Sequence, residues 1–153
     1  MKILVMSDSH GSKNNLLDAV ALESPEMILH IGDNNKDCAA IESLYPDIPL
    51  RSVRGNCDTH SAGLDIDEFV IDGICFLMTH GHLFGVKTSM KRITEYAASR
   101  NADVLLFGHT HIPYYSIDDG MHVINPGSIR IGEKSYAVLV IKNGAVLCEH
   151  KKL

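Results

Sequence analysis

Short apolar runs alternate with amphipathic segments along the first third of the chain. Each run is followed by a polar loop and then by a segment whose apolar residues recur at helical spacing. The predicted strands are Lys2–Met6, Met27–Ile31 and Pro49–Val53, and the predicted helices run from about Lys13 to Leu22, with Ser12 as cap, and from about Asp37 to Leu44. This alternation is typical of a mostly parallel sheet, in which ligands gather at the carboxyl ends of the strands.

The pattern changes after Ile66, where turn dipeptides join neighbouring apolar runs into hairpins. The predicted elements are Ile66–Ile71 and Ile74–Met78 joined by Asp72-Gly73, a helix over about Ser89–Ser99, a buried strand over Val104–Phe107, and hairpins over Tyr115–Ile124 and Tyr136–Cys148. No linker, repeat or low-complexity segment interrupts the chain. Residues 1–153 are therefore expected to form a single α/β domain, a sandwich of two packed β-sheets flanked by helices.

Residues that can bind metal ions follow five of these apolar runs directly. The clusters are Asp8-Ser9-His10, Gly32-Asp33, Gly55-Asn56, His80 and Gly108-His109-Thr110-His111. Their carboxylate, imidazole and carboxamide groups suit Mn, Fe, Zn or Ni better than Ca or Mg. The ligands are too many for one ion but suit two that share a bridging carboxylate. Two such ions clamp a phosphate and lower the pKa of a bridging water, so that the metal-bound hydroxide attacks phosphorus in line.

Composition narrows the class of protein. The chain is 45% hydrophobic and 22% charged, which is ordinary for a globular domain. A net charge of −5 and a pI near 5.9 argue against nucleic-acid and anionic-membrane partners, which would need a basic face. The four cysteines show no disulfide or C-x-x-C spacing, and the N-terminus is interpreted as a first strand rather than a signal peptide. A cytoplasmic location with reduced thiols is expected.

In this order and at strand ends, D-x-H, G-D, G-N, H and G-H-x-H resemble the motifs of the calcineurin-like metallophosphoesterases. The resemblance extends from Asp8 to Asn125-Pro126-Gly127-Ser128, and the G-N-C-D form is similar to that of the small bacterial and archaeal phosphodiesterase branch. It implies the four-layer fold of that family, a β-sandwich with helices on both outer faces. It also implies two divalent metal ions, and we take manganese as first choice before Fe, Ni or Zn. A homodimer or homotetramer is compatible with it.

The same resemblance assigns each metal ligand. One ion would be held by Asp8, His10 and His111, the other by Asn56, His80 and His109, and Asp33 would bridge them.

One position departs from the pattern of many relatives. Their asparagine motif reads G-N-H-D/E, and that histidine is thought to protonate the leaving alcohol, whereas this chain has Cys57. A thiol with a pKa near ~8.5 is a poorer acid at neutral pH than an imidazole near ~6.5. We therefore expect weak turnover, best with activated leaving groups such as nitrophenolate. The small phosphodiesterase branch shares the cysteine, and His82 or a water is the candidate substitute donor.

Other polar residues near the clusters allow both a functional and a structural interpretation. Asn34 could donate to a phosphate oxygen, and Arg54 could steer phosphate or form a surface salt bridge. Asp58 could orient Cys57 or a ligand, or cap a turn. His82 is expected to lie behind the metal ligands or to face the substrate, because His80 directly follows the strand and is the preferred ligand. Two features are expected to be structural: His30, as a core histidine that donates to a backbone carbonyl, and Asn125-Pro126-Gly127-Ser128, as a tight turn near the metals. Surface or structural positions are expected for His60, His122 and His150.

The sequence thus predicts a dinuclear-metal phosphoesterase, specifically a phosphodiesterase that hydrolyses a small phosphodiester. One alternative is a protein-binding scaffold on the same fold, as in a subunit of the retromer coat, a relative whose metal site is degraded. The complete set of ligands in this chain favours the enzyme. A nuclease is the second alternative, and the acidic charge together with the lack of a basic or aromatic platform counts against it.

Overall fold

Two five-stranded sheets pack face to face in the computed structural model, which describes residues 1–59 and 62–153. The expectation for His60 therefore lies outside the described residues. The first sheet has the order β10-β9-β1-β2-β3 and consists of β1 (Lys2–Met6), β2 (Met27–His30), β3 (Leu50–Ser52), β9 (Ser135–Lys142) and β10 (Ala145–Lys152). The second has the order β4-β5-β6-β8-β7 and consists of β4 (Ile66–Ile71), β5 (Ile74–Thr79), β6 (Val104–Leu106), β7 (Tyr114–Asp118) and β8 (Met121–Asn125).

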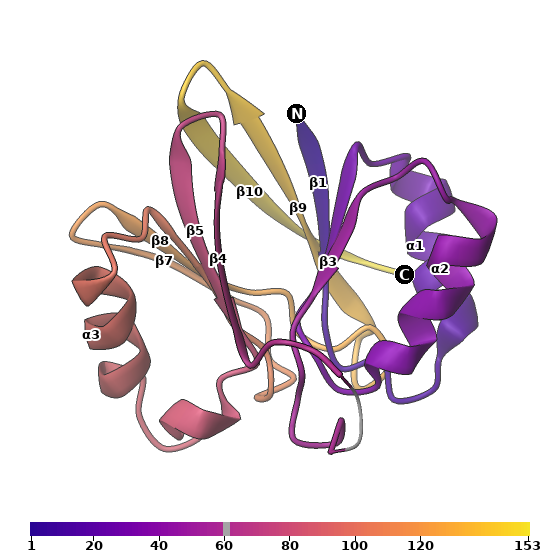
Figure 1. The fold of residues 1–153 in the computed structure, drawn as a ribbon, viewed down its shortest axis with the longest axis horizontal. Coiled ribbons are helices and arrows are strands. Elements are labelled where there is room, and N and C mark those ends of the chain that lie inside the picture. The colour runs from indigo at the N-terminus through magenta and orange to yellow at the C-terminus, as the bar shows by residue number, and fades with distance from the viewer. Residues whose placement is uncertain (60–61) are drawn as a thin grey trace.

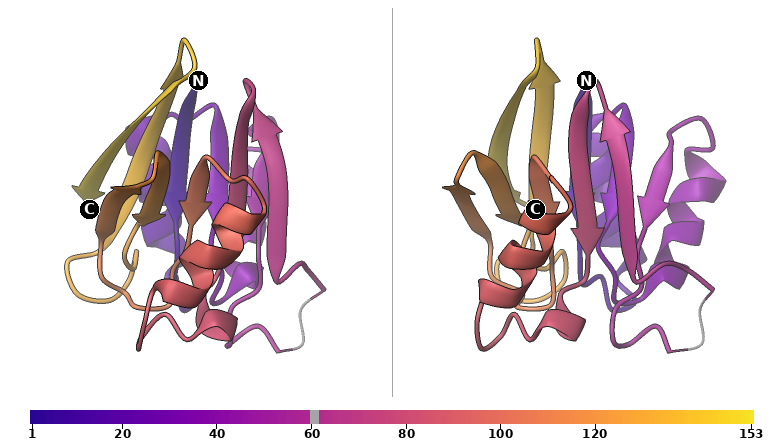
Figure 2. Two further views of the ribbon diagram at one scale, coloured as in Figure 1. Left: turned by 90° about the vertical axis from the view of Figure 1, so that its left-hand side faces the viewer. Right: turned by 60° about the vertical axis from the view of Figure 1, so that its left-hand side comes forward.

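Helices cover both outer faces of this sandwich, which confirms the predicted four-layer α/β architecture (Figures 1 and 2). Against the first sheet lie α1 (Lys13–Glu23) and α2 (Cys38–Leu44), and against the second lies α3 (Lys91–Ser99). Two short 3-10 turns, η1 (Asn35–Asp37) and η2 (His82–Phe84), follow β2 and β5. None of the helices in the described residues is both long and apolar enough to cross a membrane.

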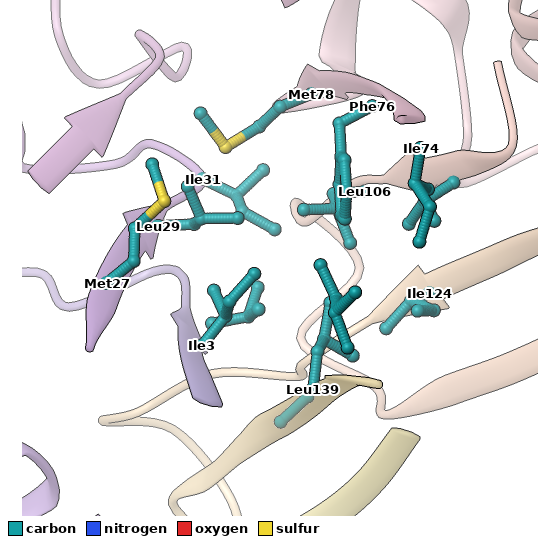
Figure 3. Packing of buried hydrophobic residues seen from close by; sticks show 14 of the residues in the cluster. Ile3, Met27, Leu29, Ile31, Ile74, Phe76, Met78, Leu106, Ile124 and Leu139 are labelled. Atoms are coloured by element: carbon teal, nitrogen blue, oxygen red, sulfur yellow. The ribbon is translucent and has the colours of Figure 1, made fainter. Parts of the chain in front are cut away.

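Alternation along the strands divides the core into layers. On β1, Ile3 and Val5 point between the sheets, while Leu4 and Met6 pack against the helix layer with Leu16. The inter-sheet layer draws aliphatic side chains from both sheets, and Figure 3 shows them interdigitating across the gap. Because successive strand residues face opposite ways, one register satisfies both layers, and this fixes the point at which each strand ends.

The carboxyl ends of the parallel strands carry the predicted metal ligands to one edge of the sandwich (Figure 1). β1, β2 and β3 are parallel neighbours in the first sheet, and β5, β6 and β8 are parallel neighbours in the second. The strand ends of the two sheets are in direct contact at this place. Nδ1 of His80, which follows β5, lies 2.7 Å from the carbonyl oxygen of Ile31, which follows β2. Ligands from both sheets can therefore converge.

Several element ends differ from the sequence predictions. The first sheet is mixed, because β9 pairs antiparallel with β1 and β10 with β9. η1 takes up Asp37, so α2 starts one residue later than predicted, and α3 starts at Lys91 rather than Ser89. Ser12 occupies the N-cap position of α1, but its side chain makes no capping hydrogen bond.

The prediction for His30 was right about burial and wrong about the partner. The ring is fully buried, and its Nδ1 lies 3.2 Å from Oδ1 of Asn35, a side-chain amide rather than a backbone carbonyl. Asn35 lies in η1, which folds back over the end of β2. Its side chain is therefore close enough to contact the ring.

Truncating a side chain in the inter-sheet layer should destabilise the protein strongly. Leu29 is fully buried there, so Leu29→Ala is expected to lower the free energy of unfolding by about 2–5 kcal/mol, measured by urea denaturation. Leu147→Ala is the control, because Leu147 on β10 is 63% exposed, and its effect should stay within about 0.5 kcal/mol. Equal losses in the two variants would contradict this description of the core.

Candidate metal centre

The first group of predicted ligands unites one carboxylate and two imidazoles from two segments that lie far apart in the sequence. The ligand atoms of Asp8, His10 and His111 all lie within 4.8 Å of one another. Nε2 of His111 lies 3.0 Å and Nε2 of His10 lies 3.8 Å from Oδ1 of Asp8. This is the set that the sequence assigns to one metal ion.

The second group is built around Asp33. The ligand atoms of Asp33, His80 and His109 also lie within 4.8 Å of one another. Oδ2 of Asp33 is 3.5 Å from Nε2 of His80 and 3.7 Å from Nε2 of His10, which belongs to the first group. Asp33 thus lies between the two groups, as a bridging carboxylate would.

Two buried nitrogen atoms in this centre have no hydrogen-bond partner. They are Nε2 of His10 and Nε2 of His80. Buried polar atoms in native proteins are nearly always hydrogen-bonded, since an unsatisfied one costs about 1–3 kcal/mol. Both nitrogens face the carboxylates at separations too long for a good hydrogen bond but compatible with ligands around a shared cation. The side chains therefore fit a divalent metal ion.

The orientation of His80 is fixed by the backbone of the other sheet. Its Nδ1 donates to the carbonyl oxygen of Ile31 at 2.7 Å, and a carbonyl can only accept. In the neutral ring the proton is thus held on Nδ1, and the lone pair of Nε2 faces Asp33 and Asp8. Metal-binding histidines are typically oriented in this way, with the second ring nitrogen hydrogen-bonded to a carbonyl or carboxylate.

The buried carboxylates and imidazoles strongly affect one another's protonation. Burial acts to raise the pKa of Asp33, but the neighbouring His80 and the backbone N–H of Cys57 lower it well below its usual range. Burial acts to lower the pKa of His80, yet the nearby negative charges of Asp33 and Asp8 raise it above 6.5. At His109, burial and the positive charges of His80 and Lys87 lower the pKa to about 4. Asp33 is thus ionised and His109 neutral at neutral pH, as ligands must be.

Left-handed backbone conformations are concentrated at the predicted ligands. Positive φ angles occur at five of them, namely Asp8, His10, Asp33, His109 and His111, and also at Asn34. A non-glycine residue in this region costs on the order of 1 kcal/mol or more, and such strain is typical of functional sites. The surrounding fold must therefore hold these loops in place.

Two glycines allow the loops to approach the carboxylates closely. A Cβ atom added at Gly55 would lie 2.0 Å from Oδ1 of Asp33, and one added at Gly108 would lie 2.2 Å from Oγ of Ser7 and 3.0 Å from Oδ2 of Asp8. Any side chain at either position would displace a carboxylate. This is the physical reason for the glycines in G-N and G-H-x-H.

Asn56 and Cys57 lie at the exposed rim of the centre. The backbone N–H of Cys57 donates to Oδ1 of Asp33 at 2.9 Å, while Nδ2 of Asn56 lies 3.4 Å from the sulfur of Cys57. The sulfur is also within 4.8 Å of ligand atoms of His10 and Asp33. Burial raises the pKa of the thiol, and the negative charge of Asp33 raises it further, so Cys57 keeps its proton.

Three further candidates from the sequence lie near the centre, and two of them, Asp58 and Arg54, pair with other parts of the chain. Asp58 caps turns, because its carboxylate accepts from the backbone N–H groups of Asn34 at 3.0 Å and Gly55 at 2.9 Å. Arg54 pairs with Asp65 at 2.8 Å. Asn34 is half-buried beside the centre.

His82 lies against two predicted ligands. Its ring centroid is 5.4 Å from that of His80 and 6.1 Å from that of His109. Burial and the positive charge of His80 lower its pKa below 6.5, so the ring is neutral at neutral pH.

The sequence analysis did not predict several residues that hold the centre in shape. Asp37 is fully buried, and its Oδ2 accepts from Oγ of Ser9 at 2.8 Å and from the backbone N–H of Gly11 at 2.7 Å, which fixes the D-x-H loop. Oγ of Ser7 donates to Asp8 at 2.6 Å. Neither role has a sequence signal, because each depends on a partner brought near by folding.

The Asn125–Ser128 turn has the structural role predicted for it. The side-chain amide of Asn125 donates to the carbonyl of Gly108 at 3.0 Å, and Oγ of Ser128 donates to the carbonyl of Asp8 at 2.9 Å. This turn therefore joins the D-x-H and G-H-x-H loops.

Known proteins share both the sequence and this architecture. Residues 1–144 match the calcineurin-like phosphoesterase superfamily domain. The chain belongs to the calcineurin-like phosphoesterase superfamily. It is 36% identical to the probable metallophosphoesterase YsnB of Bacillus subtilis over 95% of this chain and 87% of the relative. It is 30% identical to phosphodiesterase MJ0936 of Methanocaldococcus jannaschii over 83% of each. A predicted phosphoesterase from Streptococcus pneumoniae has the same fold, with a TM-score of 0.81 at 24% identity, over 99% of this chain and 88% of that one.

Acid should destabilise the metal-free protein through His109. The folded-state pKa of about 4 lies below the ordinary 6.5, so between these values the unfolded chain binds a proton that the folded chain does not. The free energy of unfolding contributed by this group therefore falls as the pH is lowered through that window. His109→Ala should lose less stability than the parent protein between about pH 7.5 and about pH 5 in urea denaturation. Equal losses would contradict the assignment.

Proposed function

We propose that this chain is a dinuclear-metal phosphodiesterase that hydrolyses small phosphodiesters. The observation that carries the proposal is the position of Asp33 between two groups of ligands, each of which includes two imidazoles. The family supports a divalent metal centre and a phosphoester substrate. The name of the Methanocaldococcus relative, phosphodiesterase MJ0936, supports a diester rather than a monoester.

The two ions would be held by the ligand sets that the sequence assigns. Asp8, His10 and His111 would hold one ion, His80, His109 and Asn56 would hold the other, and Asp33 would be shared by both sets. When bound, two such cations supply the positive charge that acidifies a water molecule and neutralises the phosphate. Asn56 has the least support, because its amide lies at the exposed rim and contacts the sulfur of Cys57.

The contribution of the protein is to hold these ligands in place before the substrate arrives. His80 is tied to the Ile31 carbonyl, and Asp8 is held by Ser7 and by the backbone N–H of His109 at 3.2 Å. Such preorganisation lowers the cost of reaching the transition state, because the ligands need not reorient during the reaction.

Proton supply to the leaving group is the weak part of this centre. Cys57 holds its proton tightly, and His82 is neutral at neutral pH, so neither is matched to protonate an alkoxide. Esters whose leaving group is stable as an anion avoid this requirement. Activated diesters are therefore the substrates on which turnover should be fastest.

Manganese is the proposed metal, with Fe, Ni and Zn as alternatives, because mixed carboxylate and imidazole shells accept all four.

The proposed compartment is the cytoplasm. Its support is that Cys38, Cys57, Cys75 and Cys148 are all free thiols, which an oxidising compartment would tend to pair.

Hydrolysis of bis-p-nitrophenyl phosphate by metal-stripped protein tests the proposal. Activity should return when Mn²⁺ is added, exceed that on p-nitrophenyl phosphate, and fall at least about 100-fold in His109→Ala. His122→Ala is the matched control, since His122 pairs with Tyr115 on the second sheet and should leave activity unchanged. Absence of hydrolysis with Mn, Fe, Ni and Zn would favour a protein-binding scaffold instead.

Restoring an imidazole at position 57 should improve turnover of unactivated diesters. A well-placed general acid contributes about 10²–10⁴-fold, so Cys57→His is expected to raise kcat for an alkyl diester at least about tenfold and to change that for the nitrophenyl diester much less. Cys57→Ser, which keeps the size but adds no acid, should not improve either substrate. Equal gains on both substrates would show that proton supply is not the limitation.

A further inference from the structure

A pocket of about 370 Å³ opens beside the predicted metal ligands and plays no part in binding the ions. This volume is within the range of about 300–1,000 Å³ that is typical of small-molecule sites. Its walls are almost entirely apolar or aromatic, and Lys87 is the one charged residue among the lining residues that the structure describes. The residues that line it are Val86, Lys87, Met90, Phe107, Thr110, Ile112 and Tyr114.

The pocket shares its frame with the metal centre. Thr110, which lines it, stands between the ligands His109 and His111. On the opposite side, a Cβ added to Gly81, the residue after His80, would lie 3.0 Å from Cγ2 of Val86 and 3.7 Å from Cβ of Phe107. The pocket wall thus packs directly against the two chain segments that supply ligands.

The residues that line the pocket suit an aromatic ring. Phe107 is buried and forms part of the wall, with the ring of Tyr114 edge-on at 6.1 Å. Ile112 is 67% exposed and Tyr114 is 41% exposed, so both present apolar surface to an incoming group. Aromatic rings pack well in such offset and edge-to-face surroundings. Large exposed apolar groups gathered in one place typically mark a binding surface.

Charge at the pocket complements the phosphate of a substrate. Lys87 is exposed and lines the pocket together with Thr110, the residue between the ligands His109 and His111. It therefore gives the pocket beside the metal centre a positive charge. A ligand that combines a phosphate with an apolar ring on the adjoining ester oxygen would match both surfaces at once.

We infer that this pocket binds the aromatic ring of one ester group, so that the preferred substrates are phosphodiesters with an aryl or nucleobase-bearing group. The inference rests on the proposed function, because it places the phosphate at the metal centre. The polar groups in the pocket are few, so recognition is by packing rather than by reading the edge of a particular base. Preference should therefore be broad among rings but strong against alkyl groups.

Binding of phosphonates to the Mn²⁺-loaded protein, measured by titration calorimetry, tests this without catalysis. Phenylphosphonate should bind at least about tenfold more tightly than methylphosphonate or n-butylphosphonate, since ring burial removes apolar area from water and adds aromatic contacts. The ratio should fall toward one in Ile112→Ala/Tyr114→Ala. It should persist in the control Ile117→Ala, because Ile117 lies on β7 outside the pocket lining and is 59% exposed.

The results separate failure of this inference from failure of the proposed function. If methylphosphonate binding requires Mn²⁺ but phenylphosphonate binds no more tightly, the pocket inference is overturned and the metal centre stands. If n-butylphosphonate equals phenylphosphonate, the preference for a ring is overturned. If no phosphonate binding depends on Mn²⁺, the proposed function itself fails.

The natural source of the ring can be distinguished with two sugar phosphates. Tighter binding of AMP than of ribose 5-phosphate would assign the pocket to nucleobases. Equal binding alongside a preference for phenylphosphonate would assign it to simple aryl esters.

Discussion

Two carboxylates buried side by side are the constraint on which the rest of this structure depends. Asp8 is fully buried and Asp33 is 2% exposed, and burying a charge is costly unless an opposite charge or hydrogen-bond donors face it. Ser7, backbone N–H groups and four imidazoles from loops far apart in the sequence surround these oxygens. The same donors and imidazoles that offset the cost of burying the carboxylates also form a potential cation site. The residues that stabilise the fold here are therefore the same ones that could serve its function.

The strained loops of the centre depend on the core between the sheets. Left-handed conformations at five ligands each cost free energy, and the inter-sheet layer provides the stability that offsets this cost. Braces such as Asp37, Asp58 and Ser128 transmit that rigidity, since each joins a ligand loop to a segment elsewhere in the chain. The site is therefore rigid although it is made of loops, as a preorganised catalytic centre requires.

The substrate side of the centre is less complete than the metal side. Cys57 at the rim and a neutral His82 supply protons poorly, whereas an apolar pocket next to the G-H-x-H loop offers binding energy to a ring. Under the proposed function, these features favour substrates that have a good leaving group and ester substituents that add affinity. Binding energy at a remote group can compensate for a missing catalytic group, provided that the group is held in the correct orientation.

The sequence by itself determined the layers, most elements and the ligand clusters, because burial imposes an alternation that can be read locally and because strand ends are where polar residues interrupt it. The G-H-x-H and G-D patterns could be recognised for the same reason. Tertiary structure alone decided the partner of His30, the pairing of Arg54 with Asp65, the antiparallel addition of β9 and β10, and the roles of Asp37 and Ser128. It also decided the pocket, whose walls come from segments that folding brings together. Each of these depends on contacts between residues distant in sequence, for which no local pattern exists.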